Sequence, residues 1–318
     1  MKILITGAAG FIGFHLSKSI LNDGYEVLGI DNINDYYDPN LKLARLDQLK
    51  PYKNFTFNKV DIADRESITR SFQQFKPNKV VNLAAQAGVR YSIENPYAYM
   101  DSNLTGFLNI IELCRHNDVE GLIYASSSSV YGGNTKIPFS VEDRVDIPIS
   151  LYGATKRANE LMAFSYSHLY GLHTTGLRYF TVYGPWGRPD MAMFIFTRKI
   201  LAGEPIPVFN HGNMKRDFTY IDDIISGTKA AIDKNYKCEV FNLGNHKSEQ
   251  LMDVVSLIEK NLGKKAEINF SPMQPGDVQE SFADIEKSIE MLNFSPQTNI
   301  DEGIKEFVNW FNRGYYAK

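Results

Sequence analysis

Short apolar runs alternate along the chain with longer stretches whose apolar positions recur at helical spacing. An apolar run of about five residues is typical of a strand buried in a parallel sheet, whereas an apolar stripe repeating about every three to four residues is typical of an amphipathic helix. The predicted strands are Lys2–Thr6, Glu26–Ile30, Phe55–Val60, Lys79–Leu83, Gly121–Ala125 and Thr174–Tyr179. The predicted helices are His15–Leu21, Leu41–Leu49, Ala63–Phe75, Tyr97–His116 and Tyr152–Tyr170.

This regular alternation predicts an α/β fold with a doubly wound parallel sheet, the Rossmann arrangement. In such a sheet a ligand binds at the carboxyl ends of the strands. The length of 318 residues indicates two domains, because a single domain usually holds about 100–200 residues. Candidate site residues are therefore those that directly follow each strand.

Composition narrows the possible functions. The formal net charge is −3 and no face or arm is rich in Lys and Arg, so we expect no nucleic-acid partner. No apolar run is long enough to cross a membrane, and Met1–Ile5 meets Gly7 at once, as a buried strand does and a signal peptide does not. The two cysteines, Cys114 and Cys238, and the six scattered histidines lack metal-ligand spacing. We therefore expect no metal site and a cytoplasmic location.

A glycine-rich turn links the first predicted strand to the first helix. Gly7, Gly10 and Gly13 are spaced G-x-x-G-x-x-G. Glycines in such a turn allow the backbone to approach a pyrophosphate, which lies at the positive end of the helix dipole. The glycine pattern alone is common, but its position between a strand and a helix predicts a dinucleotide site.

Residues at the ends of the next three strands suit the rest of a dinucleotide. The second strand ends at Asp31, whose carboxylate can accept hydrogen bonds from ribose hydroxyls and repel a 2′-phosphate, which favours NAD over NADP. Asp61 and Ile62 follow the third strand, in a position suited to the adenine edge. Small residues after the fourth strand, Ala84 and Ala85, allow a cofactor to pack closely.

Two groups of polar side chains complete the predicted site. The serines Ser126–Ser129 follow the fifth strand, and Tyr152 and Lys156 stand four residues apart on a helix. Positions four apart lie on one helix face, so we expect the Lys156 ammonium, together with the positive charge of an oxidised nicotinamide, to lower the pKa of the Tyr152 phenol toward the range of a general base. Either group alone has an ordinary explanation, as a solvated turn or a chance spacing. Their order after the phosphate turn and the ribose acid favours an enzyme that removes a proton from an alcohol.

Together these motifs resemble the extended short-chain dehydrogenase/reductase family, in particular its nucleotide-sugar 4-epimerases. The resemblance covers essentially the whole chain and rests on Thr6–Gly13, Asp31–Asn32, Asp61–Ile62, Leu83–Gln86, Ser126–Gly132, Tyr152–Lys156 and Arg216–Asp223. It implies that Ser127 bonds the reacting sugar oxygen, that Tyr152 is the acid/base, and that Lys156 holds the nicotinamide ribose. The residues implied to bind NAD are Gly7, Gly10, Phe11, Ile12, Gly13, Asp31, Asn32, Asp61, Ile62, Leu83, Ala84, Ala85, Tyr152 and Lys156.

The segments Gln86–Ser92 and Phe180–Ala192 look like the UDP-glucuronate 4-epimerase branch. UDP-glucose 4-epimerases usually carry Asn where this chain has Thr181, whose hydroxyl can hydrogen-bond a sugar carboxylate. Arg90 and Arg188 suit either that carboxylate or the diphosphate, and the sequence leaves open which arginine meets which anion. The residues implied to bind the UDP-sugar are Arg90, Ser127, Ser128, Ser129, Thr181, Arg188, Val208, Phe209, Arg216 and Asp277.

The resemblance also implies the domain organisation and the assembly. Residues 1–179 with about 217–244 are expected to form the NAD-binding domain, in which Val240–Gly244 returns to the large sheet as a strand. Residues of about 180–216 with 245–318 are expected to form a smaller, discontinuous α/β domain for the UDP-sugar. Apolar stretches on the helices after Tyr97 and Tyr152 suit a homodimer through paired helices.

The reaction implied by the resemblance is the interconversion of UDP-glucuronate and UDP-galacturonate. Tyr152 takes the proton of the 4-hydroxyl while the C4 hydride passes to tightly bound NAD, and the 4-keto sugar turns over before the hydride returns. That intermediate is a β-keto acid and loses carbon dioxide readily. We therefore expect Thr181 with Ser128 or Ser129 to hold the carboxylate so that the breaking bond does not align with the carbonyl π system.

Other activities on the same scaffold stay open. A UDP-glucuronate decarboxylase differs in how the carboxylate is oriented, and epimerases of UDP-glucose or UDP-N-acetylhexosamine share the chemistry. Sugar 4,6-dehydratases commonly carry Asp-Glu after the catalytic hydroxyl, where this chain has Ser128-Ser129. A silent dinucleotide-sensing protein would usually lack Tyr152 or Lys156. Release of carbon dioxide would separate the decarboxylase from the epimerases.

Overall fold

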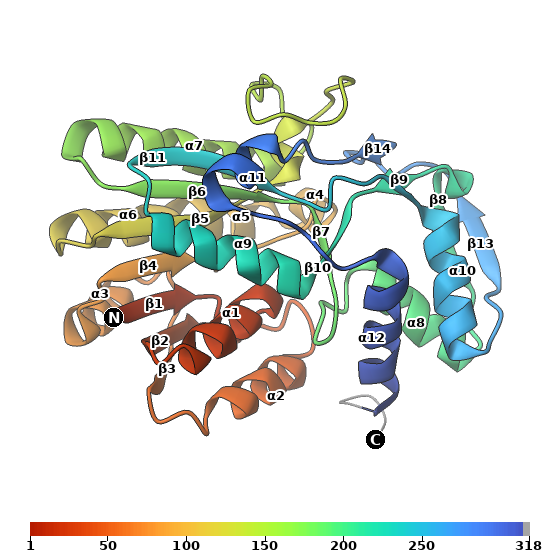
Figure 1. The fold of residues 1–318 in the computed structure, drawn as a ribbon, viewed down its shortest axis with the longest axis horizontal. Helices are drawn as coiled ribbons and strands as arrows, with labels where there is room; N and C mark the ends of the chain where they lie inside the picture. Colours follow the sequence, from red (N-terminus) through yellow and green to blue (C-terminus); the bar gives the residue numbers. More distant parts are fainter. Residues whose placement is uncertain (314–318) are drawn as a thin grey trace.

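The computed structural model describes residues 1–313 and contains one large parallel sheet with helices on both faces (Figure 1). The strand order is β11-β6-β5-β4-β1-β2-β3, and every neighbouring pair is parallel. The order reverses direction between β1 and β4, and a ligand crevice forms at such a point. The predicted fold class is confirmed. The strands are β1 (Lys2–Thr6), β2 (Glu26–Asp31), β3 (Phe55–Lys59), β4 (Lys79–Asn82), β5 (Gly121–Ser127), β6 (Thr174–Tyr179) and β11 (Cys238–Leu243).

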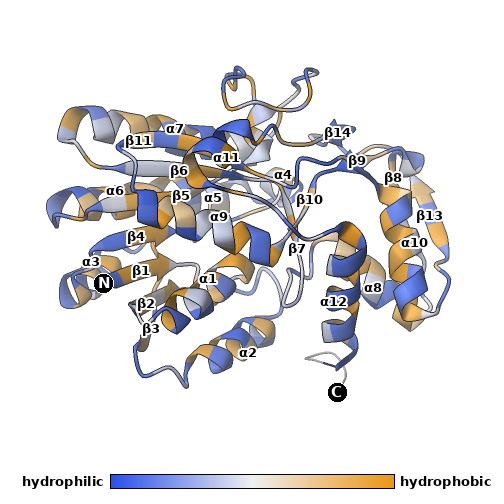
Figure 2. Cartoon of the chain, viewed as in Figure 1, coloured by the Kyte–Doolittle hydropathy of each residue, from blue (hydrophilic) through white to orange (hydrophobic). Residues whose placement is uncertain are grey.

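Two apolar layers hold the helices to the sheet. Successive side chains of a strand point to opposite faces, and Ile3 and Leu4 of β1 accordingly belong to two different core clusters. In Figure 2 the flanking helices carry both apolar and polar residues around their circumference, as amphipathic helices do. The layer with Ile3 includes α1 (Phe11–Asn22), α2 (Pro39–Leu49) and α9 (Ile221–Lys234). The layer with Leu4 includes α3 (Arg65–Phe75), α6 (Gly106–His116) and α7 (Leu151–Tyr170).

The helix predicted as one piece over Tyr97–His116 is interrupted. The structure has a short helix α5 (Pro96–Tyr99), a π-helical segment η1 (Met100–Thr105), and then α6. Asn103, within η1, accepts a hydrogen bond from the backbone N–H of Gln86 at 2.8 Å, and its own carbonyl accepts one from the Asn159 side chain at 2.7 Å. These long-range bonds stabilise the wider turn, which local helical periodicity does not predict.

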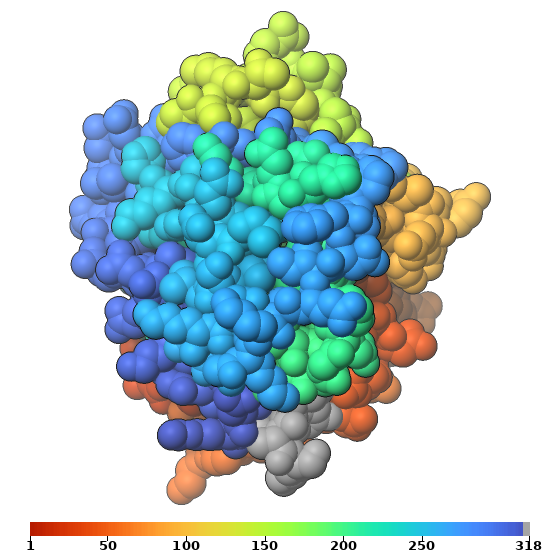
Figure 3. All heavy atoms as spheres, turned by 90° about the vertical axis from the view of Figure 1, so that its right-hand side faces the viewer, coloured from red at the N-terminus to blue at the C-terminus, as the bar shows by residue number. Residues whose placement is uncertain are grey.

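The rest of the chain forms a smaller α/β unit beside the large sheet. Its strand β8 (Ile206–Phe209) pairs in parallel with β13 (Ile268–Ser271). Three helices, α8 (Ala192–Ala202), α10 (Leu251–Leu262) and α12 (Ile300–Arg313), pack with one another or with β8. Figure 3 views this side of the molecule, where segments coloured green to blue make up most of the visible face.

Short strands connect the two units. Strand β7 (Thr181–Tyr183) pairs in parallel with β10 (Phe218–Tyr220), and β9 (Lys215–Arg216) lies between β12 (Glu249–Gln250) and β14 (Glu280–Ser281). Strand β11 returns to the large sheet beside β6, and α11 (Glu286–Leu292) lies against α9 and β11. The exact division of the chain into two domains stays a prediction. No helix within residues 1–313 is long and apolar enough to cross a membrane.

Candidate active site

A cavity of about 240 Å³ opens at the carboxyl ends of the strands of the large sheet. Its walls come from the glycine-rich turn after β1, from the ends of β2 and β4, and from the start of α7. Every residue predicted to bind NAD lines it: Gly7, Gly10, Phe11, Ile12, Gly13, Asp31, Asn32, Asp61, Ile62, Leu83, Ala84, Ala85, Tyr152 and Lys156.

The turn between β1 and α1 has room only for glycine at two positions. Gly7 has a φ of +70°, and a Cβ on it would lie 2.8 Å from the backbone nitrogen of Ala84. A Cβ on Gly13 would lie 2.0 Å from the carbonyl oxygen of Gly7. Gly10 precedes α1 without a side-chain cap, so the first N–H groups of the helix are available to an anion. The turn fits the pyrophosphate of a dinucleotide.

The acid at the end of β2 is buried and held by backbone. Asp31 accepts hydrogen bonds from the N–H groups of Ala9 at 3.1 Å and Ile33 at 2.9 Å. Burial raises the pKa of Asp31, while these hydrogen bonds and the charge of Lys42 act in the opposite direction. Asn32 donates to Asp61 at 2.9 Å, which joins the ends of β2 and β3. A fixed carboxyl group at this place suits a ribose with free hydroxyls, as in NAD.

Helix α7 presents Tyr152 and Lys156 to the cavity. The helix begins after Ser150, whose side chain accepts a hydrogen bond from the N–H of Gly153 at 3.1 Å. Burial lowers the pKa of Lys156 to about 8. Burial also raises the pKa of Tyr152, against the opposing effects of a hydrogen bond with Ser127 and the charge of Arg188. The pKa of Tyr152 in the protein is therefore raised, whereas the lowered value expected from the sequence depends also on the charge of an oxidised nicotinamide and stays a prediction.

The hydroxyls of the serine run at the end of β5 have different partners, although Ser126 and Ser127 both line the first cavity. Ser127 ends β5, and its Oγ accepts a hydrogen bond from the N–H of Ser129 at 3.1 Å, which begins the 3₁₀ turn η2 (Ser128–Tyr131). Ser126 points inward and donates to Glu160 of α7 at 2.6 Å. The hydroxyl run is thus tied to the same helix that carries Tyr152.

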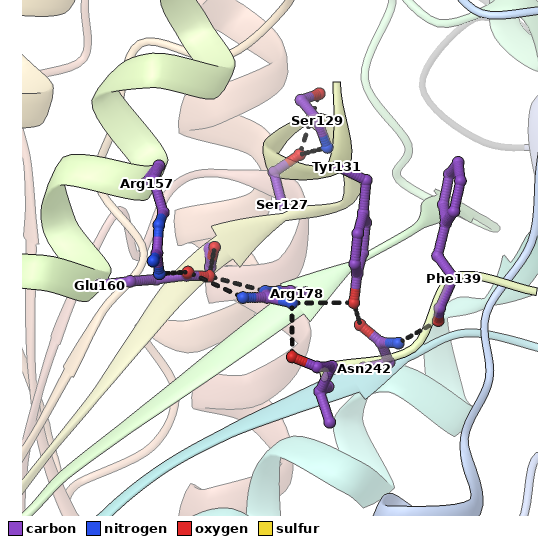
Figure 4. A network of polar contacts seen from close by, with 10 residues as sticks. Ser127, Ser129, Tyr131, Phe139, Arg157, Glu160, Arg178 and Asn242 are labelled. Carbon is purple, nitrogen blue, oxygen red and sulfur yellow. Dashed lines mark hydrogen bonds and ion pairs between the residues drawn. The ribbon is translucent and has the colours of Figure 1, made fainter. Parts of the chain in front are cut away.

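A buried polar network supports this serine turn (Figure 4). Glu160 accepts two hydrogen bonds from Arg178 of β6, at 2.8 and 2.9 Å, and one from Arg157 at 3.0 Å. Arg178 also donates to the Tyr131 hydroxyl at 2.9 Å, and Tyr131 donates to Asn242 of β11 at 2.6 Å. The network joins β6, β11, α7 and η2, so the candidate catalytic residues stand on a rigid base.

A second cavity, of about 550 Å³, adjoins the first. Tyr152, Ser127 and Arg188 line both cavities and therefore form their shared wall. A third, smaller cavity is lined by Phe209 and shares Arg90, Arg188 and Arg216 with the second. The predicted sugar-binding residues in the second cavity are Arg90, Ser127, Ser128, Ser129, Thr181, Arg188, Arg216 and Asp277.

Val208 is the exception among the predicted substrate-binding residues. Its side chain is fully buried and lines none of the three cavities, whereas its neighbours Pro207 and Phe209 line the third. Alternation along β8 places Val208 in the core. The Val208 side chain thus has no access to these cavities, and a substrate contact by Val208, which its backbone could make, stays a prediction.

The three arginines of the second cavity have different neighbours. Arg188 is near Tyr152, and its Nε donates to Asp190 at 3.0 Å. The guanidinium of Arg90 lies over the ring of Phe209, 5.1 Å from its centroid. Arg216 pairs with Asp277 at 2.7 Å. The position of Arg188 near the phenol separates it from the other two, a distinction that the sequence left open.

Three polar residues of the site were not predicted: Tyr36, Lys42 and Asp190. Tyr36 lines the first and second cavities, and its hydroxyl donates to Asp190 at 3.1 Å. Lys42 also lines the first cavity and donates to the carbonyl of Asn34 at 2.8 Å. The polar segment after Asp31 was the only sign in the sequence that residues such as Tyr36 belong to the site. The contact of Tyr36 with Asp190 could not be predicted, because the two residues are 154 positions apart.

Within residues 1–313, no group of three or more His, Cys, Asp or Glu is placed to hold a metal ion.

The glycine turn, the buried acid, and the Tyr152 and Lys156 pair on a Rossmann sheet define an extended short-chain dehydrogenase/reductase. The chain belongs to the NAD dependent epimerase/dehydratase family, whose model matches residues 3–244. It is 47% identical to UDP-glucuronate 4-epimerase 3 of Arabidopsis thaliana, over 99% of this chain and 77% of the relative.

Two solved structures are similar along nearly the whole chain. One is a UDP-glucuronic acid 4-epimerase from Bacillus cereus in complex with UDP-glucuronic acid and NAD, with a TM-score of 0.93, 36% identity, and coverage of 98% of this chain and 99% of that one. The other is a UDP-glucose 4-epimerase from Thermotoga maritima with UDP-glucose, with a TM-score of 0.91, 33% identity, and the same coverage. The resemblance found in the sequence is confirmed.

Proposed function

We propose that this protein interconverts UDP-glucuronate and UDP-galacturonate by an NAD-dependent 4-epimerisation through a 4-keto intermediate. The observation that carries the proposal is the wall shared by the two cavities. There, Tyr152 and Ser127 face both a dinucleotide site and a cavity that also holds Thr181 and Arg188. The names of the Arabidopsis thaliana and Bacillus cereus proteins support the choice of a uronic acid sugar.

NAD is the cofactor, and its site is the cavity above the glycine-rich turn. When bound, it supplies the acceptor for the hydride of C4 and gives that hydride back. The turn at Gly7 to Gly13 is suited to the pyrophosphate, and Asp31 to the adenosine ribose. Lys156 lines the same cavity and lies one helical turn after Tyr152, which suits a contact with the nicotinamide ribose.

Tyr152 is the proposed acid and base. Its phenolate takes the proton of the sugar 4-hydroxyl, and the phenol so formed later returns that proton to the same oxygen. Ser127 contacts the phenol and is placed to hold that sugar oxygen. The Arg188 charge favours the phenolate, which offsets part of the effect of burial. Ser127 and Arg188 therefore both favour the phenolate form of Tyr152, which is the form that can remove a proton.

The sugar carboxylate needs a firm grip, because a 4-keto uronic acid loses carbon dioxide readily. We assign this grip to the hydroxyls of Thr181 with Ser128 or Ser129, and to Arg188 at the Tyr152 end of the cavity. Arg90 and Arg216 are then left for the diphosphate and uridine end, where Phe209 lies. In this arrangement, different arginines bind the carboxylate and the diphosphate of the UDP-sugar.

The assembly and the location are part of the proposal. Helices α6 and α7 leave large apolar side chains exposed: Leu108 is 43%, Leu161 52% and Phe164 63% exposed. Leu161 and Phe164 are three residues apart and share one helix face, which suits a homodimer formed by α6 and α7 of two copies. The free cysteines, Cys114 and Cys238, suit the reducing cytoplasm.

The test of the proposed function is incubation of the purified protein with UDP-glucuronate and no added NAD. Products are separated by chromatography and carbon dioxide is measured. We expect UDP-galacturonate without gas and without net NADH, because the hydride returns within each cycle. UDP-pentose with gas would make the protein a decarboxylase, and turnover of UDP-glucose alone would make it an epimerase of neutral sugars.

A further inference from the structure

Arg45 of α2 is a buried cation whose hydrogen bonds all go to neutral oxygens. Its side chain is fully buried. The guanidinium donates to the carbonyl of Ala9 at 2.9 Å, to the hydroxyl of Tyr37 at 2.8 Å, twice to the carbonyl of Trp186 at 2.7 and 3.1 Å, and to that of Gly187 at 3.1 Å. The Asp31 carboxylate is close enough for the charge of Arg45 to act toward a lower pKa of Asp31, but its hydrogen bonds come from the N–H groups of Ala9 and Ile33 and not from Arg45. A buried cation without a hydrogen-bonded ion pair is costly, so the position calls for a functional explanation.

The acceptors of Arg45 belong to the two halves of the site. Ala9 lies in the glycine-rich turn, and its N–H is held by Asp31 at 3.1 Å. With Arg45 on the carbonyl and Asp31 on the N–H, both backbone groups of Ala9 are fixed just before α1 begins. Ala9 lies between Gly7 and Gly10, which line the cofactor cavity, so Arg45 helps to fix the turn that these glycines form.

On the other side, Arg45 holds the backbone that leads into Arg188. Trp186 has a φ of +63°, in the left-handed region that a non-glycine residue adopts only when its surroundings enforce it. Three successive carbonyls are bound there by side chains of the large domain: His15 of α1 contacts that of Pro185 at 2.9 Å, and Arg45 binds the next two. These hydrogen bonds therefore orient the backbone just before Arg188, and with it the Arg188 side chain.

We infer that Arg45 is a positioning residue that couples the cofactor site to the sugar site. One guanidinium fixes both the turn that receives the diphosphate of NAD and the loop that presents Arg188 to the sugar. Its positive charge lies behind the glycine-rich turn, against the Ala9 carbonyl, where it would favour a bound diphosphate. The inference rests on the proposed function, because it assumes that Arg188 meets the sugar carboxylate.

A matched control separates this role from simple structural support. Lys79 is also a buried cation, and it donates to the carbonyl of Ile232 at 2.6 Å. It lies at the amino end of β4, which is the opposite end of the sheet from the ligand cavities. Lys79→Met removes a buried cation from the protein without touching the site.

The experiment compares Arg45→Met, Arg45→Lys and Lys79→Met with the wild type by titration calorimetry. Three ligands are used: NAD on protein stripped of cofactor, and then UDP and UDP-glucuronate on protein saturated with NAD. For Arg45→Met we expect NAD and UDP-glucuronate each to bind about tenfold more weakly or worse, because hydrogen bonds from a charged group are lost. UDP, which lacks the sugar, should bind within about twofold of wild type. Lys79→Met should bind all three ligands normally.

Several outcomes would overturn the inference. It fails if Arg45→Met binds NAD and UDP-glucuronate as the wild type does, if only one of the two is weakened, or if Lys79→Met weakens them equally. Arg45→Lys keeps the charge but lacks the planar fork, so it should fall between the wild type and Arg45→Met; if Arg45→Met does not fold, normal binding by Arg45→Lys is the contrary result. A wild type that binds UDP-glucuronate without epimerising it would refute the proposed function. The binding measurements would then still test whether Arg45 couples the two sites.

Discussion

The amine of Lys156 lies 2.9 Å from the carbonyl oxygen of Ala125 and donates a hydrogen bond to it. Lys156 is on α7, four residues after Tyr152, and Ala125 is near the carboxyl end of β5, just before the serine run. The side chain is almost fully buried, and burial lowers its pKa to about 8. The protein therefore keeps a costly cation at the point where its cofactor cavity meets its catalytic helix.

Removal of that cation should stabilise the cofactor-free protein while abolishing catalysis. At pH 7 Lys156 is protonated in both states, and a folded pKa near 8 against 10.5 unfolded destabilises the fold. For Lys156→Met we expect the free energy of unfolding to rise by about 1–3 kcal/mol after the lost hydrogen bond is subtracted. Urea unfolding of NAD-stripped protein measures this change in the free energy of unfolding. A variant that is less stable than the wild type at pH 7 would contradict the argument.

The wild type should also gain stability as the pH rises from 8 to 10.5, because the folded state loses the Lys156 proton in this range while the unfolded state keeps it. The variant should lack that gain.

His15 should make the protein sensitive to acid. Burial lowers the pKa of His15 from 6.5 to about 4, so the folded state stays neutral while the unfolded state takes up a proton between these values. Stability is therefore lost as the pH falls from 6.5 toward 4, by about 2 kcal/mol at pH 5 from this group. Unfolding measured at pH 7 and pH 5 should show a smaller loss in His15→Gln, whose amide can still donate to Pro185. An equal loss in both proteins would assign the acid sensitivity to other groups.

Tyr152→Phe should remove the acid and base while leaving the fold intact. The phenyl ring fills the same space, so we expect NAD to be retained and the thermal midpoint to stay within a few degrees. The turnover number should fall by about 10²–10⁴, the usual contribution of a general acid or base. Turnover of UDP-glucuronate and the NAD content of the purified variant give the two readings. Turnover close to the wild-type value would remove Tyr152 from its proposed role.

Thr181→Ala should loosen the grip on the sugar carboxylate. Thr181 lines the second cavity near Arg188, and its hydroxyl is the group that the variant loses. We expect slower epimerisation and a larger share of UDP-pentose with carbon dioxide, because the keto intermediate is less well oriented. Thr181→Ser, which keeps the hydroxyl, is the control and should remain close to wild type. If the alanine variant changes neither turnover nor the pentose share, the assignment of Thr181 fails.

The exposed apolar face of α7 gives a test of the homodimer. Phe164→Glu places a charge where we propose that two copies meet, and burying an unpaired charge in an interface is unfavourable. We expect the variant to sediment as a monomer at micromolar concentration, where the wild type is a dimer. Ile289→Glu on α11, also at an exposed apolar residue, should leave the dimer unchanged. A monomeric wild type would refute the proposed assembly.

Much of the site was predictable because it follows from local rules. Side chains that directly follow buried parallel strands meet at one edge of the sheet, which brought Asp31 and Ser127 to the cavities as expected. The glycine spacing predicted a turn with no room for Cβ atoms, and the four-residue spacing placed Tyr152 and Lys156 on one helix face. Each of these features depends on a few neighbouring residues.

Other features depended on contacts between distant parts of the chain. The orientation of Val208 was decided by which face of β8 packs on the core, and the π-helical segment by the bonds of Asn103 to Gln86 and Asn159. Arg45 meets Trp186 across 141 positions. No pattern of neighbouring residues contains these pairings.

The strands, the helices and the chemistry at their ends were therefore determined by the sequence itself, because hydrophobic periodicity and turn chemistry act over short distances along the chain. The raised pKa of Tyr152 and the hydrogen bond from Tyr36 to Asp190 were decided only by the tertiary structure. Burial and electrostatic fields depend on everything packed around a group, and most of those neighbours are remote in sequence.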